Sequence, residues 1–268
     1  MPELPEVETI RRQLDGRLRG RRVSAAWAFE SAKFLEACDV VPATVGGVGR
    51  RGKYLVITLD GGRELIVHLG MTGQLRVRPT GEDRDRYVRA SWDLDDGEVL
   101  EFRDVRRFGR IAVVPAGEYG RLATLAALGP EPFDTGLDGA TLWRSLRSSH
   151  RHIKTQLLSQ RPIAGVGNIY ADEALWLARV HPAARRITRA RAGELLEAIR
   201  QVLAAGIEHG GTTLRDYVDS DGRQGTNQLH LRCYGRAGGP CERCGELLVR
   251  RVIDARTTTW CPHCQRLR

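Results

Sequence analysis

The chain has 268 residues, of which 41% are hydrophobic and 28% are charged, so it is long enough to bury a sizeable core. It has no run of about 18 apolar residues and no charged segment followed by an apolar one at its start, so we expect neither a membrane span nor a secretory signal. The net charge is +9, and residues 223–268 contain nine arginines against three acidic residues. We therefore expect a cytoplasmic protein that binds a polyanion.

The chain opens with the letters MPELPE. Removal of Met1, which a small second residue permits, would leave a secondary amine at Pro2. Such an amine is less basic than a lysine side chain and can attack an electrophilic carbon to form an iminium ion. The carboxylate of Glu3 could then exchange protons with the product. On these residues alone the simpler interpretation is a helix start, where proline fits the first turn and acidic residues favour the helix dipole.

The first part of the chain predicts one helix followed by short strands. Val7, Ile10, Leu14 and Leu18 recur at helical spacing after the opening motif. Strands are predicted at 54–59, 64–68, 74–78, 90–94, 99–103 and 110–114, with tight turns at 60–62 and 95–97. We therefore predict an α+β protein in which residues 1–116 form an antiparallel β-sandwich, or a barrel, with an N-terminal helix.

The pattern changes near residues 129–132, and we interpret 117–137 as a linker. From residue 138 onward the periodicity is helical, most clearly where Leu195, Ile199 and Leu203 recur. We therefore predict a helical domain over 138–231. Within it, the glycine turn at 165–169 is predicted to open a helix, and such a turn points backbone amides outward, where they suit a phosphate.

Four of the six cysteines form two close pairs separated by 16 residues: Cys241, Cys244, Cys261 and Cys264. In a reducing compartment this spacing predicts a tetrathiolate zinc site rather than disulfides. One structural Zn²⁺ is expected within a hairpin over 232–268, because four thiolates leave no open position for chemistry. We interpret Cys38 and Cys233 as ordinary packing residues.

Six segments together resemble the formamidopyrimidine-DNA glycosylase family. They are the opening 2–6, RGKY at 51–54, HLGMTG at 68–73, RRFG at 106–109, GVGNIY at 165–170 and the four-cysteine tail. The resemblance implies a helix-two-turn-helix domain that ends in a zinc finger. It also implies a base-excision repair enzyme that removes oxidised purines, such as 8-oxoguanine and formamidopyrimidines, and cuts the strand at the emptied sugar by β,δ-elimination.

By this resemblance, Pro2 is the nucleophile that attacks C1′ of the damaged nucleotide and forms a Schiff base. Glu3 is then the general acid and base, and Lys53 is a proton donor near the phosphate. Arg256 stands five residues before Cys261, as the family arginine does, and joins this catalytic set by gripping phosphate. The chemistry needs no catalytic cofactor.

The resemblance also assigns contacts with DNA. An enzyme that works at C1′ must take the base out of the stack, and Met71, Arg106 and Phe108 match the residues that fill the void.

Asn168 and Lys154 match residues that hold phosphate. Tyr87 stands where some relatives place a histidine near the DNA backbone. Residues 220–231 match a loop that covers the extruded base, although Asn227 occupies a position that is often aromatic.

Two alternatives remain open from the sequence. An endonuclease VIII-like enzyme would prefer oxidised pyrimidines, but such enzymes usually open with Pro-Glu-Gly rather than with the Leu4 and Pro5 found here. A zinc-containing DNA-binding protein without catalysis would not need Pro2, Glu3 and Lys53. The expected partner in every case is double-stranded DNA, with an oxidised base or an abasic site for the enzymes, and we expect a nucleoid-associated monomer.

Overall fold

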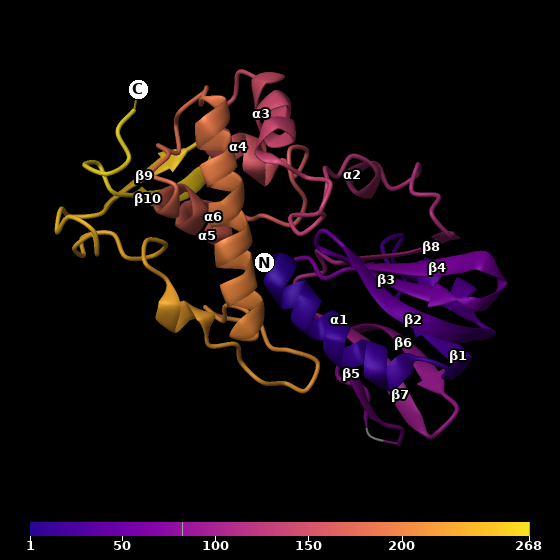
Figure 1. Cartoon of the computed structure of the whole chain (residues 1–268). Helices are drawn as coiled ribbons and strands as arrows, with labels where there is room; N and C mark the ends of the chain where they lie inside the picture. The colour runs from indigo at the N-terminus through magenta and orange to yellow at the C-terminus, as the bar shows by residue number, and fades with distance from the viewer. Residues whose placement is uncertain (82, 268) are drawn as a thin grey trace. The chain divides into compact units, whose positions relative to one another are not determined.

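The computed structural model of the chain describes residues 1–81 and 83–267 and divides into two compact units (Figure 1). The first unit comprises Met1–Ala126 and Ile207–Gln228, and the second comprises Ala127–Gly206 and Leu229–Arg268. Among the described residues, none of the helices has the length and apolar character that a membrane crossing requires.

The segment 207–228 groups with the N-terminal unit, whereas the sequence pattern placed it in the helical domain. Two hydrogen bonds explain the difference. The backbone amide of Thr212 donates to Glu6 Oε1 at 2.7 Å, and the amide of Ser220 donates to Gln13 Oε1 at 3.0 Å. These bonds join positions about 200 residues apart, which no local pattern can reveal.

Helix α1 (Leu4–Leu18) confirms the helix predicted after the opening motif. Val7, Ile10, Leu14 and Leu18 are all fully buried, because their spacing places them on one face of the helix. This face packs against strand β2, where Asp15 also accepts a hydrogen bond from the Val48 amide at 2.7 Å.

The eight strands of the first unit pair only antiparallel, in the order β5-β7-β6-β1-β2-β3-β4-β8. The six predicted strands correspond to β3 to β8. Two further strands, β1 and β2, were not predicted. Strand β1 is mostly exposed, and β2 contains three glycines, which weaken the strand signal. The bounds are β1 Arg22–Ala28, β2 Ala43–Arg51, β3 Tyr54–Leu59, β4 Arg63–His68, β5 Gly73–Pro79, β6 Val88–Leu94, β7 Glu98–Asp104 and β8 Arg110–Pro115.

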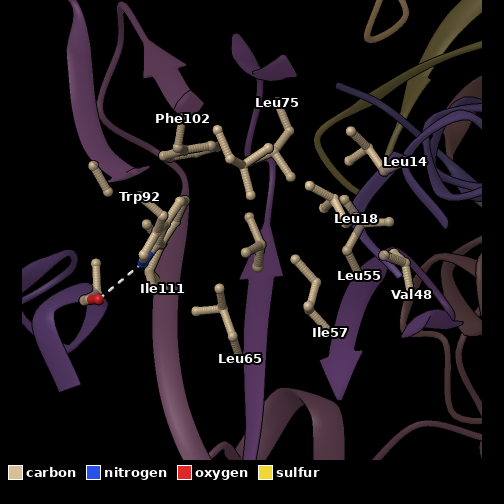
Figure 2. Packing of buried hydrophobic residues seen from close by; sticks show 14 of the residues in the cluster. Leu14, Leu18, Val48, Leu55, Ile57, Leu65, Leu75, Trp92, Phe102 and Ile111 are labelled. Atoms are coloured by element: carbon tan, nitrogen blue, oxygen red, sulfur yellow. Dashed lines mark hydrogen bonds between the residues drawn. The ribbon is translucent and has the colours of Figure 1, made fainter. Parts of the chain in front are cut away.

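This sheet folds into two halves that share one core, so the predicted β-sandwich is confirmed. The halves remain joined where β1 pairs with β2 over only two residue pairs. Leu55 and Leu65 from one half belong to the same buried cluster as Trp92 and Phe102 from the other (Figure 2). The Trp92 indole also donates to the carbonyl of Ala37 at 2.9 Å, in the short helix η1 (Leu35–Val40).

The second unit is helical and ends in a two-stranded hairpin, as predicted. Asp138 caps α3 by accepting from the Thr141 amide, and α5 packs against β10 (Figure 1). The remaining elements are α2 Ala123–Ala126 and η2 Asp60–Gly62 in the first unit, then α3 Gly139–Arg147, α4 Ile153–Leu158, α5 Asn168–Leu177, α6 Arg189–Glu208, η3 Asn227–His230, β9 Val249–Ile253 and β10 Arg256–Trp260.

Candidate functional site

The N-terminus is held by a buried carboxylate that the sequence reasoning did not single out. Pro2 is buried, and Glu3 is the N-cap residue of α1. Glu6 accepts the Glu3 amide on Oε2 and the Thr212 amide on Oε1, both at 2.7 Å. The backbone beside Pro2 is therefore fixed against the segment 207–228. An acidic residue three positions after an N-cap is a capping-box signal, which could have pointed to Glu6.

Lys53 lies in the turn between β2 and β3 and is 3% exposed. Arg50 donates to the carbonyl of Gly52 at 3.0 Å and, through Nε, to Glu8 of α1 at 3.1 Å. Burial raises the pKa of Glu8, but hydrogen bonds from Arg11, Arg12 and Arg50 outweigh this effect. The pKa is therefore lowered overall, and the carboxylate stays charged. Arg50 thus ties the Lys53 turn to the helix that begins beside Pro2.

His68, at the end of β4, fixes the loop that carries Met71. Its ring lies 4.7 Å from the Tyr54 ring, and its Nδ1 accepts the Gly70 amide at 3.1 Å. Burial, together with the positive charges of Lys53 and Arg110, lowers the pKa of His68 to about 4. The imidazole is therefore neutral near pH 7, with the proton on Nε2.

We expect His68→Gln to reduce the loss of stability in acid. The folded pKa of about 4 lies below the unfolded value, so the unfolded chain binds the proton first, and stability falls as pH drops from about 6.5 to about 4. This one group should account for about 2 kcal/mol of unfolding free energy between about pH 8 and pH 5. Urea unfolding of both proteins at these two pH values measures it. An unchanged pH dependence in the variant would contradict the assignment.

Met71, Arg106 and Phe108 lie in two loops and are exposed. Met71 is 38% and Phe108 is 48% exposed, which is unusual for such large apolar side chains. The guanidinium of Arg106 lies 4.9 Å from the centre of the Phe108 ring. The two loops thus present a thioether, a guanidinium and an aromatic ring toward solvent.

A buried hydroxyl–carboxylate pair locks these two loops together. Thr72 Oγ1 donates to Asp104 Oδ1 at 2.6 Å and accepts the Arg106 amide at 3.0 Å. Asp104 Oδ2 accepts the Gly109 amide at 2.7 Å. A side chain at Gly70 would come within 2.5 Å of the Gly109 nitrogen, so only glycine permits this approach of the loops. Thr72 lies within the HLGMTG motif and Asp104 just before the RRFG motif, but only the contact in the folded chain reveals their role.

Tyr87 is half-buried among arginines. Its hydroxyl accepts from Arg86 at 2.6 Å, and the guanidinium of Arg103 lies 5.1 Å from the ring centre. The backbone carbonyl of Tyr87 also accepts the Asp104 amide at 2.9 Å. Tyr87 is therefore held next to the same carboxylate residue that locks the two loops, in cationic surroundings that suit phosphate.

Asn227 anchors the loop of residues 220–231 rather than presenting itself at a tip. It is 4% exposed, and its side-chain amide donates to Thr212 Oγ1 at 2.8 Å. Its backbone amide donates to the carbonyl of Gly211 at 3.1 Å. A short polar side chain at this position therefore holds the loop to the segment that also contacts Glu6.

In the second unit, the structure differs from the sequence expectation for Lys154. We expected a direct phosphate contact, but Lys154 is 1% exposed. Its ammonium lies 2.6 Å from Asp172 and donates to Thr257 O and Thr258 Oγ1 at 3.1 and 2.9 Å. Asp172 also accepts the Thr259 amide at 2.9 Å. Lys154 is thus a positioning residue that fastens strand β10 to α4 and α5.

Asn168 and Arg256 lie next to Thr257, whose carbonyl accepts a hydrogen bond from Lys154. Asn168 opens α5, and its Nδ2 donates to Thr257 O at 3.1 Å. Its Oδ1 is buried and has no hydrogen-bond partner among the described residues. Arg256 is exposed and begins β10, directly after the hairpin tip. Asp254 at this tip contacts His152 Nδ1 at 2.9 Å, and hydrogen bonds from Thr155 and His152 lower the pKa of Asp254.

The four predicted cysteine ligands come together, since their sulfur atoms all lie within 4.8 Å of one another. A tetrahedral zinc with bonds of about 2.3 Å places its sulfur ligands about 3.8 Å apart, so the donor set fits Zn²⁺ and leaves no open position. The Trp176 indole donates to Cys241 Sγ at 3.4 Å, a contact that orients this ligand. Cys233 packs in the same buried cluster, as expected, whereas Cys38 is exposed, which corrects its assignment as a packing residue.

Comparison with known proteins covers the whole chain. Three family models match, described as the formamidopyrimidine-DNA glycosylase N-terminal domain at residues 1–111, its H2TH domain at 128–218, and a zinc finger found in FPG and IleRS at 238–267. Formamidopyrimidine-DNA glycosylase of Herpetosiphon aurantiacus is 44% identical, with 99% of this chain and all of the relative covered. That of Deinococcus radiodurans is 42% identical, covering 100% and 98%.

Solved structures agree. The MutM (FPG) protein of Thermus thermophilus has a TM-score of 0.91 and 43% identity, covering 100% of both chains. The Lactococcus lactis Fpg in complex with DNA containing an abasic site has a TM-score of 0.90 and 32% identity, covering 98% of this chain and 99% of that one. A variant of the L. lactis protein in complex with Fapy-dG-containing DNA has a TM-score of 0.90 and 33% identity, covering 99% and 100%.

Proposed function

Since the chain belongs to the formamidopyrimidine-DNA glycosylase family, we propose that it is a base-excision repair DNA glycosylase and AP lyase for oxidised purines in double-stranded DNA. The observation that carries this proposal is the buried Pro2–Glu3 start, which is fixed by Glu6 in the same unit as Lys53. 8-Oxoguanine and the ring-opened formamidopyrimidines are the proposed lesions.

In the proposed reaction, the Pro2 nitrogen, freed by removal of Met1, attacks C1′ of the extruded nucleotide. The bond between C1′ and the base breaks, and the base leaves with the electron pair and a proton. Glu3 protonates the ring oxygen as the sugar opens, which leaves an iminium between Pro2 and C1′.

The iminium withdraws electrons and acidifies the C2′ proton. Loss of this proton expels the 3′ phosphate, and a second elimination expels the 5′ phosphate. Lys53 serves as proton donor near the phosphate, and Arg256 holds the phosphate charge. Water then hydrolyses the conjugated iminium and regenerates Pro2, so these steps need no catalytic cofactor.

The remaining site residues position the DNA. Met71, Arg106 and Phe108 fill the space of the extruded base, which their exposure at locked loop tips supports. Tyr87 and Asn168 contact the backbone. The structural zinc stabilises the hairpin that presents Arg256. Because the substrate is chromosomal DNA and a single lesion needs one active site, the protein works as a monomer at the nucleoid.

Thr72→Val should weaken the grip on damaged DNA. Valine keeps the shape but leaves Asp104 Oδ1 and the Arg106 amide without their partner, which should cost about 1–3 kcal/mol of unfolding free energy. With the loops no longer locked, affinity for a duplex with an abasic analogue should fall several-fold. Urea unfolding and fluorescence anisotropy measure the two effects. Thr72→Ser is the matched control, since it retains the hydroxyl. Equal losses of stability and affinity in both variants would show that the hydroxyl of Thr72 does not lock the loops.

Borohydride trapping on a duplex with one 8-oxoguanine opposite cytosine tests the proposed function. Borohydride reduces an iminium to a stable amine, so a covalent protein–DNA band that maps to Pro2 is the expected result. Intact mass must first show that Met1 is absent, because a retained Met1 would bury the nucleophile in an amide. A band with an oxidised pyrimidine but none with 8-oxoguanine would instead favour the endonuclease VIII-like activity. No band with any lesion would leave only DNA binding.

A further inference from the structure

The second unit contains a groove of about 950 Å³, here called the arginine groove, that the proposed reaction does not use. Two histidines line it, but no carboxylate does. Five arginines therefore line one cavity without an acidic residue in its wall. They are Arg179, Arg186, Arg191, Arg243 and Arg266.

The positive charge of the arginine groove is only partly balanced. Arg191 pairs with Glu194 at 2.7 Å, but within the described chain no ion pair reaches the other four arginines. Cys244 and Cys264 also line the groove, and a zinc ion with four thiolates carries two negative charges. With one positive charge paired and two balanced by the zinc site, two remain without a counter-charge. An anionic ligand would relieve this repulsion.

Backbone carbonyls hold several of these arginines in place without neutralising them. Arg243 donates to the carbonyls of Trp176 and Leu177 at 2.6 and 2.8 Å, at the end of α5. Arg186 donates to the carbonyl of Arg147 at 2.8 Å. These two guanidinium groups are therefore ordered before a ligand arrives, which lowers the entropy cost of binding.

The wall of the groove is also apolar in part, because Val180, Ala184 and Ile187 line it. A nucleic-acid backbone offers repeated charge but no side chain for such a surface. An acidic peptide offers carboxylates, which match the guanidinium fork, and apolar side chains beside them. The mixture of arginine and apolar lining therefore favours a peptide.

The groove also lies away from the proposed phosphate contact. Arg256 begins β10 at the tip of the hairpin, whereas His181 of the groove packs edge-on against Trp260 at the other end, with ring centres 5.3 Å apart. Five strand residues separate these ends by about 13 Å. We propose that the arginine groove binds an acidic segment of a partner protein in which carboxylates flank apolar side chains.

The test is fluorescence anisotropy with the full-length, zinc-loaded protein and a labelled peptide of about eight residues in which Asp and Leu alternate. The double variant Arg179→Asn/Arg266→Ser removes two groove charges, and asparagine tolerates the left-handed backbone at position 179, where φ is +53°. We expect it to weaken binding at least about tenfold. The control Arg250→Ser/Arg251→Ser removes the same charge from exposed positions on β9 and should stay within about twofold.

Two further arms separate the possible ligands. A peptide with Asn in place of Asp should bind at least about tenfold more weakly, and saturating duplex with an abasic analogue should not displace the acidic peptide. Displacement by the duplex would make the groove a nucleic-acid surface. No binding at low salt, or equal losses in both double variants, would overturn the proposal. The claim that the groove lies away from the DNA rests on the proposed role of Arg256. Peptide binding is measured without DNA, and the proposed function is tested separately by borohydride trapping. Failure of the peptide proposal can therefore be distinguished from failure of the proposed function.

Discussion

Replacement of Glu3 by Gln should lower excision of 8-oxoguanine by about 10²–10⁴-fold, the range that general acid–base catalysis contributes. Glutamine has the same shape but cannot supply a proton to the sugar ring oxygen. The bond from the Glu3 amide to Glu6 involves only the backbone and should persist. Single-turnover excision from a duplex with one lesion measures the effect.

Two readouts separate acid catalysis from a structural role of Glu3, which is also the N-cap of α1. Affinity for a duplex with an abasic analogue should stay within about twofold, because glutamine keeps the size of Glu3 and none of the residues proposed to hold the DNA backbone changes. Cleavage of a preformed abasic site should fall much less than excision, because its sugar can already open to the aldehyde. Excision at the normal rate would refute the acid–base assignment. Parallel loss of binding and excision would point to a structural role instead.

Lys154→Met should destabilise the second unit by about 3–5 kcal/mol, the usual effect of removing one partner of a buried ion pair. The variant leaves the Asp172 carboxylate, which is 1% exposed, without its cation. It also removes the bonds to Thr257 and Thr258 that hold β10, so Arg256 and Asn168 should lose their fixed positions. Urea unfolding of the zinc-loaded protein gives the stability change, and anisotropy with abasic-analogue DNA gives the affinity.

The double variant Lys154→Met/Asp172→Asn is the matched control. It replaces both charges, and asparagine can still accept the Thr259 amide, so it should recover most of the lost stability. Another outcome would instead support the direct phosphate contact that the sequence led us to expect for Lys154. Lys154 would contact phosphate directly if Lys154→Met kept its stability but bound DNA more weakly, and if the dependence of log affinity on log salt concentration became shallower by about one phosphate contact.

Much of the fold followed from spacing along the chain. The buried positions of α1 repeat at helical spacing, and the six strands from β3 to β8 alternate with tight turns. The zinc ligands could also be predicted, because the spacing of the paired cysteines depends only on the local geometry of their turns. Strand β2 escaped prediction because its glycines carry no apolar pattern, although its pairing with β3 makes it a strand.

The candidate site was predicted less evenly. Motif positions located Pro2, Glu3, Lys53 and the exposed loop tips, but they did not show what holds these residues in place. Glu6 reaches Thr212 across 206 positions of the chain, and Thr72 reaches Asp104 across 32. Lys154 was expected to hold phosphate, but its position in the motif did not show that it is buried.

The sequence by itself therefore determined helix α1, the strands from β3 to β8, the cysteine ligands and the residues proposed for Schiff-base catalysis. All of these depend on residue type and on spacing within a few turns of the chain. Only the tertiary structure decided that Lys154 is buried against Asp172, that Asp104 joins the two exposed loops, and that five arginines share one groove. Burial and charge pairing depend on contacts between distant segments, and those contacts exist only in the folded chain.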